Sequence, residues 1–207
     1  MYIKSNIDTI GVDEVGRGSL FGNVIAAAVI MPYNIAEDDK LYNQIKDSKK
    51  ISFKKRCILA DYIKTNAITY GIGFATPKEI DNINILQASI KAMHRALFEA
   101  YKKNKFNNII VDGNYFKPII CPDNDDEIIT YECIPKGDEK YINIAAASII
   151  AKDYHDNEII NMVNEYPELN KYDLLKNMGY GTLKHRTAII ENGIHEFHRK
   201  SFSCCNN

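Results

Sequence analysis

Two apolar runs, at residues 8–15 and 22–31, constrain the fold more than any other feature of the sequence. A connection rich in glycine joins them, and Pro32 stops the second run. Short apolar runs joined in this way predict two neighbouring antiparallel strands. The carboxylate pair Asp13-Glu14 stands just before the connection. The first strand is therefore expected to carry two acids to an edge of a sheet.

The rest of the chain alternates between strand patterns and helix patterns. We expect three further strands, at residues 68–75, 109–113 and 128–134. Helical spacing predicts helices from Ser52, over roughly 84–104, over 141–165 and from Thr182 through Ile190. In the third of these helices, the residues expected to face the core are Ile142, Ala145, Ile149 and Tyr154. Together the patterns predict an α/β fold, with a five-stranded mixed sheet flanked by helices.

Composition excludes several classes of protein. The 207 residues are 45% hydrophobic and 26% charged, and no apolar run approaches the roughly 20 residues that span a bilayer. The start of the chain is too polar for a secretory signal, so a cytoplasmic location without membrane contact is expected. Five cysteines without a C-x-x-C pair indicate free thiols.

With a net charge of −1, any contact with nucleic acid must come from local basic clusters, here residues 46–56 and 184–200. Such charge runs are most often solvated faces.

Four acids stand where the predicted strands end. They are Asp13, Glu14, Asp112 and Asp138, the last in the run Lys136-Gly137-Asp138. Ends of adjacent strands converge at one edge of a mixed sheet, where ligands normally bind. Clustered carboxylates need cations, and oxygen ligands alone favour Mg²⁺ or Mn²⁺, with two ions suiting phosphodiester hydrolysis. Because neighbours on a strand point to opposite faces, a site shared by the first two acids requires a bend there. The alternative is a solvated strand end.

The glycine motif Gly16-Arg17-Gly18 matches neither a P-loop nor a dinucleotide fingerprint. It is either a hairpin turn or a place where backbone amides and Arg17 approach a sugar-phosphate. Tyr180, between two glycines, is either a half-buried loop aromatic or a side chain that stacks on a sugar or base.

Other polar residues have weaker patterns. Ser48 and Lys49 precede a predicted helix and form either a phosphate clamp or an exposed turn. Lys152 and Asp156 lie on the same face of a predicted helix, four residues apart. They are expected to form either a surface ion pair or an ion pair that supports a nearby site. His185 lacks metal-ligand spacing and is expected to be structural or to face phosphate.

The motifs, taken together and in order, resemble bacterial ribonuclease HII, of the type 2 ribonuclease H family. The matching stretches are Asp13–Gly18, Asp47–Lys50, Asn84–Ala88, Val111–Asn114, Lys136–Asp138, Ala146–Lys152, Gly179–Thr182 with His185, and His198–Phe202. Ribonuclease HIII, the sister family, is longer and lacks arginine in the glycine motif, so Arg17 favours HII. Two positions and one loop depart from the pattern: His155 replaces an expected arginine, Ser19 replaces a frequent proline, and the 114–127 loop is acidic and enlarged.

The resemblance implies one ribonuclease H-like catalytic domain over residues 1–207, with a C-terminal helical segment at about 165–207. It implies an endonuclease that uses Mg²⁺ or Mn²⁺ to cut RNA in RNA·DNA hybrids and 5′ to single ribonucleotides in duplex DNA, leaving 3′-hydroxyl and 5′-phosphate ends. Such an enzyme serves ribonucleotide excision repair and is expected to be a monomer. By position, Asp13, Glu14, Asp112 and Asp138 would bind the metals. The substrate would be bound by Gly16, Arg17, Gly18, Ser48, Lys49 and Tyr180.

Two other functions remain open from the sequence. One is a hybrid-binding protein that has lost catalysis, and the other is a different nuclease or recombinase of the same fold. Retention of all four acids argues against the first, because unneeded clustered acids destabilise a site. The glycine motif together with Tyr180 argues against the second.

Overall fold

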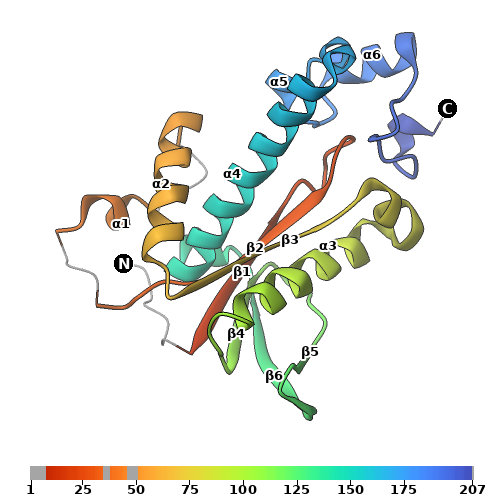
Figure 1. Ribbon diagram of the computed structural model, residues 1–207. Helices are drawn as coiled ribbons and strands as arrows, with labels where there is room; N and C mark the ends of the chain where they lie inside the picture. Colours follow the sequence, from red (N-terminus) through yellow and green to blue (C-terminus); the bar gives the residue numbers. More distant parts are fainter. Residues whose placement is uncertain (1–7, 35–37, 46–50, 207) are drawn as a thin grey trace.

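One mixed sheet forms the centre of the molecule (Figure 1). The computed structural model describes residues 8–34, 38–45 and 51–206. Its strands are β1 (Thr9–Val15), β2 (Val24–Ile30), β3 (Thr69–Ala75), β4 (Asn108–Asp112), β5 (Ile119–Cys121) and β6 (Asn124–Ile134). Their order across the sheet is β3-β2-β1-β4-β6-β5. β1 pairs antiparallel with β2 and parallel with β4, and β4 pairs parallel with β6, so the predicted mixed sheet is confirmed.

The prediction of five strands is wrong by one. Part of the expected 114–127 loop forms β5 and the beginning of β6, which pair antiparallel as a hairpin. The two prolines that suggested a loop lie outside the strands, one before β5 and one in the turn after it. Ile119 is buried against the core and pairs with Ile129. A strand of three residues is too short to leave a recognisable alternation in the sequence.

Helices cover both faces of the sheet (Figure 1). They are α1 (Lys40–Gln44), α2 (Phe53–Asn66), α3 (Pro77–Tyr101), α4 (Ile142–Glu165), α5 (Leu174–Asn177) and α6 (Leu183–Asn192). Alternate residues of β2 face opposite cores: Ala26 and Ala28 pack toward α3, whereas Ile25 and Ala27 pack toward α2 and α4. Because β2 is buried on both faces, its sequence is a continuous apolar run.

Helix boundaries follow local capping. The side chains of Ser52 and Thr182 cap α2 and α6, as predicted. α3 begins seven residues earlier than the predicted start at 84, where Thr76 and Glu79 form a capping box. Asn84 has a positive φ of 65° inside α3, and its side chain accepts a hydrogen bond from the Gln87 amide. The predicted start therefore corresponds to a kink, where the second part of the helix is capped.

One core prediction on α4 is wrong. Ile142, Ala145 and Ile149 are buried, but Tyr154 is 36% exposed. Five residues separate Tyr154 from Ile149, which turns its side chain well away from the buried face at 3.6 residues per turn. α4 itself lies close against β1, since a Cβ on Gly11 would come within 2.4 Å of the Asn143 backbone.

The chain after α4 folds back onto the connection between β1 and β2. Leu20 and Phe21 from this connection are buried with residues of α4, α5 and α6. Isolated bridges join Ser19 to Tyr180 and Phe21 to His198. Among the described residues no helix is long and apolar enough to cross a membrane.

Candidate active site

Three parallel strands bring acidic residues to one edge of the sheet. β1, β4 and β6 run in the same direction, so their carboxyl ends lie at the same edge. Asp13 lies near the end of β1, and Asp112 is the last residue of β4. Asp138 follows β6, in a short 3₁₀ helix at Gly137–Glu139. The predicted convergence of these strand ends is therefore observed.

Asp13 is the most buried of the acids on β1, with only 7% of its surface exposed. Its carboxylate accepts a hydrogen bond from the Glu14 amide at 2.8 Å and lies beside the Ser148 hydroxyl of α4. Burial, followed by the charges of Glu14 and Asp112, raises the pKa of Asp13 well above its ordinary value. Three negative groups thus lie close enough to repel one another. Ser148, which the sequence analysis did not single out, partly offsets this repulsion.

Glu14 follows Asp13 in the strand without a bend. Both residues pair with β2, and the strand continues to Val15, so the bend expected at the acid pair is absent. Glu14 instead pairs with Arg17, whose Nη1 lies 3.1 Å from its Oε1. Burial raises the pKa of Glu14, Arg17 lowers it and Asp112 raises it, with a net upward shift. Glu14 therefore remains coupled to Asp112 although it follows Asp13 on the alternate side of the strand.

Asp112 accepts a hydrogen bond from the residue that precedes Asp138. The Gly137 amide donates a hydrogen bond of 2.6 Å to Oδ1 of Asp112. Lys136, just before it, has a left-handed φ of 56°, which turns the chain sharply after β6. A Cβ on Gly137 would lie 2.5 Å from Cδ1 of Ile144, so a larger residue here would require that side chain of α4 to move. Asp138, which is 3% exposed, directly follows the glycine whose amide contacts Asp112.

The acids supply oxygen donors for a hard divalent cation, but they do not form a complete cage as they stand. Among residues 8–34, 38–45 and 51–206, no group of three or more acidic, histidine or cysteine side chains is arranged to hold a metal ion. The contacts of Glu14 with Arg17 and of Asp112 with Gly137 occupy one oxygen each. The donor chemistry and the mutual repulsion of these acids fit a divalent cation.

The glycine motif and Tyr180 lie in contact. Gly16 is buried with a φ of +86°, whereas Arg17 and Gly18 are exposed. Burial raises the pKa of the Tyr180 hydroxyl, and a hydrogen bond with the Gly16 backbone partly offsets that shift. A Cβ on Gly18 would lie 3.9 Å from the Tyr180 ring. The structure thus joins two motifs that are more than 160 residues apart in the sequence.

A sequence profile described as ribonuclease HII matches residues 10–205. The chain belongs to the ribonuclease HII family. Ribonuclease HII from Christiangramia forsetii is 46% identical over 201 residues, which cover 97% of this chain and 93% of the relative. Ribonuclease HII from Trichodesmium erythraeum is also 46% identical, over 94% of this chain and 86% of its own. Membership of the ribonuclease HII family makes the protein a metal-dependent endonuclease that hydrolyses nucleic acid.

Solved structures share the fold. The ribonuclease H2 from Pyrococcus horikoshii superimposes with a TM-score of 0.70 at 25% identity, covering 96% of this chain and 95% of that one. Bst-RNase HIII, whose crystal structure was determined in complex with Mn²⁺, gives a TM-score of 0.69 at 22% identity and covers 96% of this chain and 68% of its own. The predicted ribonuclease H-like fold is confirmed, apart from the strand number.

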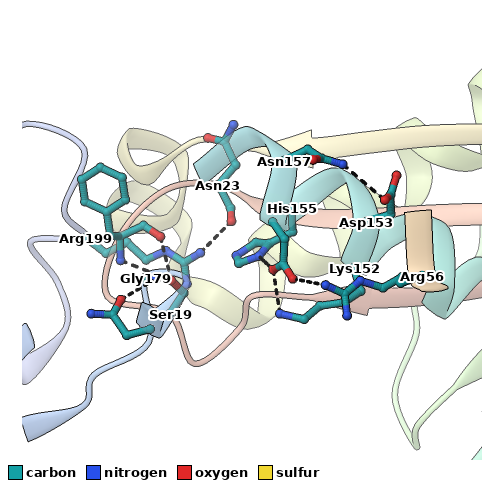
Figure 2. A network of polar contacts seen from close by, with 12 residues as sticks. Ser19, Asn23, Arg56, Lys152, Asp153, His155, Asn157, Gly179 and Arg199 are labelled. Carbon is teal, nitrogen blue, oxygen red and sulfur yellow. Dashed lines mark hydrogen bonds and ion pairs between the residues drawn. The ribbon is translucent and has the colours of Figure 1, made fainter. Parts of the chain in front are cut away.

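Asp156 lies at the centre of a buried ionic network beside the ribonuclease HII glycine motif. Of the two predicted roles of the ion pair with Lys152, that of a surface pair is wrong, because Asp156 is 2% exposed, and that of support for a nearby site stays a prediction. Arg56 donates to its Oδ2, Lys152 donates to Oδ1 at 2.7 Å, and Nδ1 of His155 contacts Oδ1 at 3.1 Å (Figure 2). Burial would raise the pKa of Asp156, but hydrogen bonds from His155 and Lys152 outweigh it and lower the pKa. The carboxylate is therefore ionised and holds three side chains in place.

His155, where ribonuclease HII is expected to carry arginine, packs directly beneath Gly16. Its ring carbon Cδ2 and Nε2 would both lie 3.0 Å from a Cβ on Gly16. Burial lowers the pKa of His155, so the ring is neutral at physiological pH. The Asp156 network thus reaches the glycine motif through this ring.

Of the two roles predicted for His185, the structure supports the structural one. His185 is fully buried, and its Nε2 lies 3.1 Å from Nε2 of His198. The His195 amide donates to Nδ1 of His198 at 2.9 Å, a shorter contact than the 3.3 Å between this nitrogen and the His195 oxygen, so we place the proton of His198 on Nε2, from which it is donated to His185. His185 then carries its proton on Nδ1, 3.1 Å from the Tyr180 carbonyl oxygen, which accepts it. A second proton on either ring breaks this chain of hydrogen bonds.

The histidine pair predicts that stability falls at acid pH. Burial and then His185 lower the pKa of His198 to about 4, below the ordinary histidine value of about 6.5. Between these values the unfolded state binds the extra proton, so the free energy of unfolding falls as pH decreases, by at most about 1.4 kcal/mol per pH unit for this group. Urea denaturation of wild type and His198→Gln across this range measures the slope. Equal slopes for the two proteins would contradict the assignment.

The two basic clusters of the sequence have different outcomes. Ser48 and Lys49 lie outside the described residues, and their role as a phosphate clamp stays a prediction. Arg199 was counted with a solvated basic cluster, and this is wrong, because its side chain is completely buried. It donates hydrogen bonds to the backbone oxygens of other residues. Contacts of this kind produce no residue pattern that could be recognised in the sequence.

Proposed function

We propose that this protein cleaves RNA within RNA·DNA hybrids and cuts duplex DNA on the 5′ side of single embedded ribonucleotides. The products are 3′-hydroxyl and 5′-phosphate ends. One observation carries the proposal: the glycine motif that contacts Tyr180 directly follows the strand that bears Asp13 and Glu14. A sugar bound at the motif therefore lies next to the acids, which links recognition of a ribose to hydrolysis beside it.

The four acids are proposed to bind two Mg²⁺ or Mn²⁺ ions. Asp13, Glu14, Asp112 and Asp138 supply only oxygen donors, which suits these ions. When bound, a pair of such ions supplies an activated water and stabilises the leaving oxygen. The raised pKa values of Asp13 and Glu14 support this role, because repulsion of this kind is relieved by a cation. Chelation by EDTA is expected to remove activity.

Recognition of the ribose is proposed for Gly16, Arg17 and Gly18, with Tyr180 stacking on the deoxyribose that follows. Exposed amides and a guanidinium can hydrogen-bond a 2′-hydroxyl and its phosphate. Ser48 and Lys49 are proposed to contact a phosphate further along the strand. We also propose a monomeric, single catalytic domain over residues 1–207, in which the segment at about 165–207 contributes Tyr180.

Arg17→Ala is expected to weaken discrimination between ribose and deoxyribose. Loss of one charge-assisted contact to the sugar-phosphate costs about 2 kcal/mol, or about 30-fold in kcat/KM for a duplex with one ribonucleotide. Glu14 loses its ion-pair partner, so its affinity for Mn²⁺ is expected to be kept or raised. Cleavage and metal affinity are measured on the same preparation. Unchanged selectivity for this duplex over the matching all-DNA duplex would contradict the role of Arg17.

The test of the proposed function uses three duplexes of one sequence, with no, one or several ribonucleotides in one strand. Each is incubated with the purified protein in Mg²⁺ or Mn²⁺. We expect cleavage of the second and third duplexes and none of the first. Absence of cleavage of both ribonucleotide-containing duplexes, in either metal, would reject the proposal.

A further inference from the structure

The glycine motif belongs to a connection that must be held in shape. The chain leaves β1 after Val15 and enters β2 at Val24, with three glycines between. Glycine lets this chain turn tightly, but it also leaves many backbone conformations open. A loop that recognises a 2′-hydroxyl by its amides needs those amides fixed within a fraction of an ångström. The support must therefore come from outside the loop.

Arg199 reaches both arms of this connection from the chain after α6 (Figure 2). Its Nη1 donates to the carbonyl oxygens of Gly16 at 2.6 Å and Arg17 at 3.2 Å. Its Nε donates to the oxygen of Gly22 at 3.0 Å, and Nη2 donates to that of Asn23 at 2.9 Å. One planar guanidinium thus ties the chain that leaves β1 to the chain that enters β2.

These contacts determine where the loop amides point. In a trans peptide the C=O and the following N–H lie in one plane and point in opposite directions. Because the oxygens of Gly16 and Arg17 face Arg199 in the interior, the N–H groups of Arg17 and Gly18 point away from it. Arg17 and Gly18 are the exposed residues of the motif. Arg199 therefore aims two donors toward the side from which a substrate approaches.

The guanidinium is held by carbonyl groups and not by an ion pair. Within the described part of the chain, no carboxylate lies in ion-pair distance of Arg199, although its side chain is fully buried. Burial lowers its pKa to about 10, so it stays protonated at physiological pH. Its own backbone is fixed by a hydrogen bond of 2.9 Å from its amide to the Leu20 oxygen. A buried charge of this kind depends on the loop carbonyls, and the loop depends on the charge.

We propose that Arg199 is a positioning residue for ribose discrimination, which orients the amides of Arg17 and Gly18 through the carbonyls of the glycine motif. The inference rests on the proposed function, since it assumes that this motif binds the ribose. Lysine cannot replace Arg199, because a single ammonium cannot reach four oxygens arranged around a planar fork.

The test compares Arg199→Ala and Arg199→Lys with wild type on a duplex that contains one ribonucleotide, and measures competition by the matching all-DNA duplex. We expect kcat to fall about 100-fold in both variants, because a displacement of the substrate by about an ångström lowers the rate by about this factor. We also expect the preference for the ribonucleotide duplex over the DNA competitor to be largely lost. Millimolar guanidinium is expected to restore part of the activity of Arg199→Ala, and none of that of Arg199→Lys.

Arg95→Ala is the matched control. Arg95, on α3, also donates to a backbone oxygen, that of Phe74 at 2.6 Å, and pairs with Glu79, and both of these partners lie outside the glycine motif. Its loss is expected to lower stability and leave kcat and discrimination unchanged. If Arg199→Ala does not fold, the kcat and the discrimination of Arg199→Lys alone test the proposal. Variants that melt at lower temperature but keep wild-type kcat and discrimination would overturn the proposal, whereas failure of wild type to cut would reject the proposed function instead.

Discussion

Asp112→Asn is expected to reduce cleavage of ribonucleotide-containing duplexes by at least about 1,000-fold, or about 4 kcal/mol in activation free energy. Asparagine keeps the size of the side chain and an oxygen that accepts the Gly137 amide, so the local fold is preserved. It removes the charge that we propose for metal binding. It also removes one of the charges that raise the pKa of Asp13, so the free energy of unfolding without metal is expected to be unchanged or slightly higher.

Single-turnover cleavage in Mg²⁺ and in Mn²⁺, together with urea denaturation, measures both effects. Asp123→Asn is the control, since Asp123 is an exposed acid near the β5–β6 turn that pairs with Lys105. It is expected to cut at the wild-type rate. An Asp112→Asn protein that cuts within tenfold of wild type would show that the metals are bound elsewhere.

Asp156→Ala is expected to lower the free energy of unfolding by about 3–5 kcal/mol. The reason is that Arg56 is itself buried, so removal of the carboxylate leaves a buried guanidinium without its charge partner. Lys152 and His155 lose the same partner. Because His155 packs beneath Gly16, a moderate loss of activity is expected as well.

Urea denaturation at neutral pH gives the free energy of unfolding for this comparison. Asp61→Ala, at an exposed position on α2, is the control and is expected to change it by less than about 0.5 kcal/mol. If Asp156→Ala unfolds at the wild-type urea concentration, the network does not stabilise the fold as described.

Regular patterning made most of the fold predictable. The runs that became β1, β2, β3 and β4 carry long apolar or β-branched stretches, and Ser52 and Thr182 mark helix starts by their capping chemistry. β5 was missed because three residues leave no detectable period. The acids could be found because each lies at or just after the end of a strand pattern, and the parallel pairing of β1, β4 and β6 brings these strand ends together.

The supports of the site could not be predicted. Arg199 donates hydrogen bonds to carbonyl oxygens between 176 and 183 residues away in the sequence. Because every residue type has a backbone carbonyl, the sequence does not indicate which residues accept these bonds. From the sequence, Asp156 was predicted to pair with Lys152 at helical spacing, either at the surface or in support of a site, while Arg56 lies 100 residues away on another helix. Only the three-dimensional packing of α2 against α4 shows that this pair is a buried network.

Mapping the ends produced from a duplex with one ribonucleotide is the most direct test of the central claim, that the glycine motif selects the ribose beside which the acids cut. We expect a single cut in the ribonucleotide strand, on the 5′ side of the ribonucleotide, with a 3′-hydroxyl on one fragment and a 5′-phosphate on the other. Cuts at deoxynucleotides away from the ribose, or fragments with a 3′-phosphate, would contradict it.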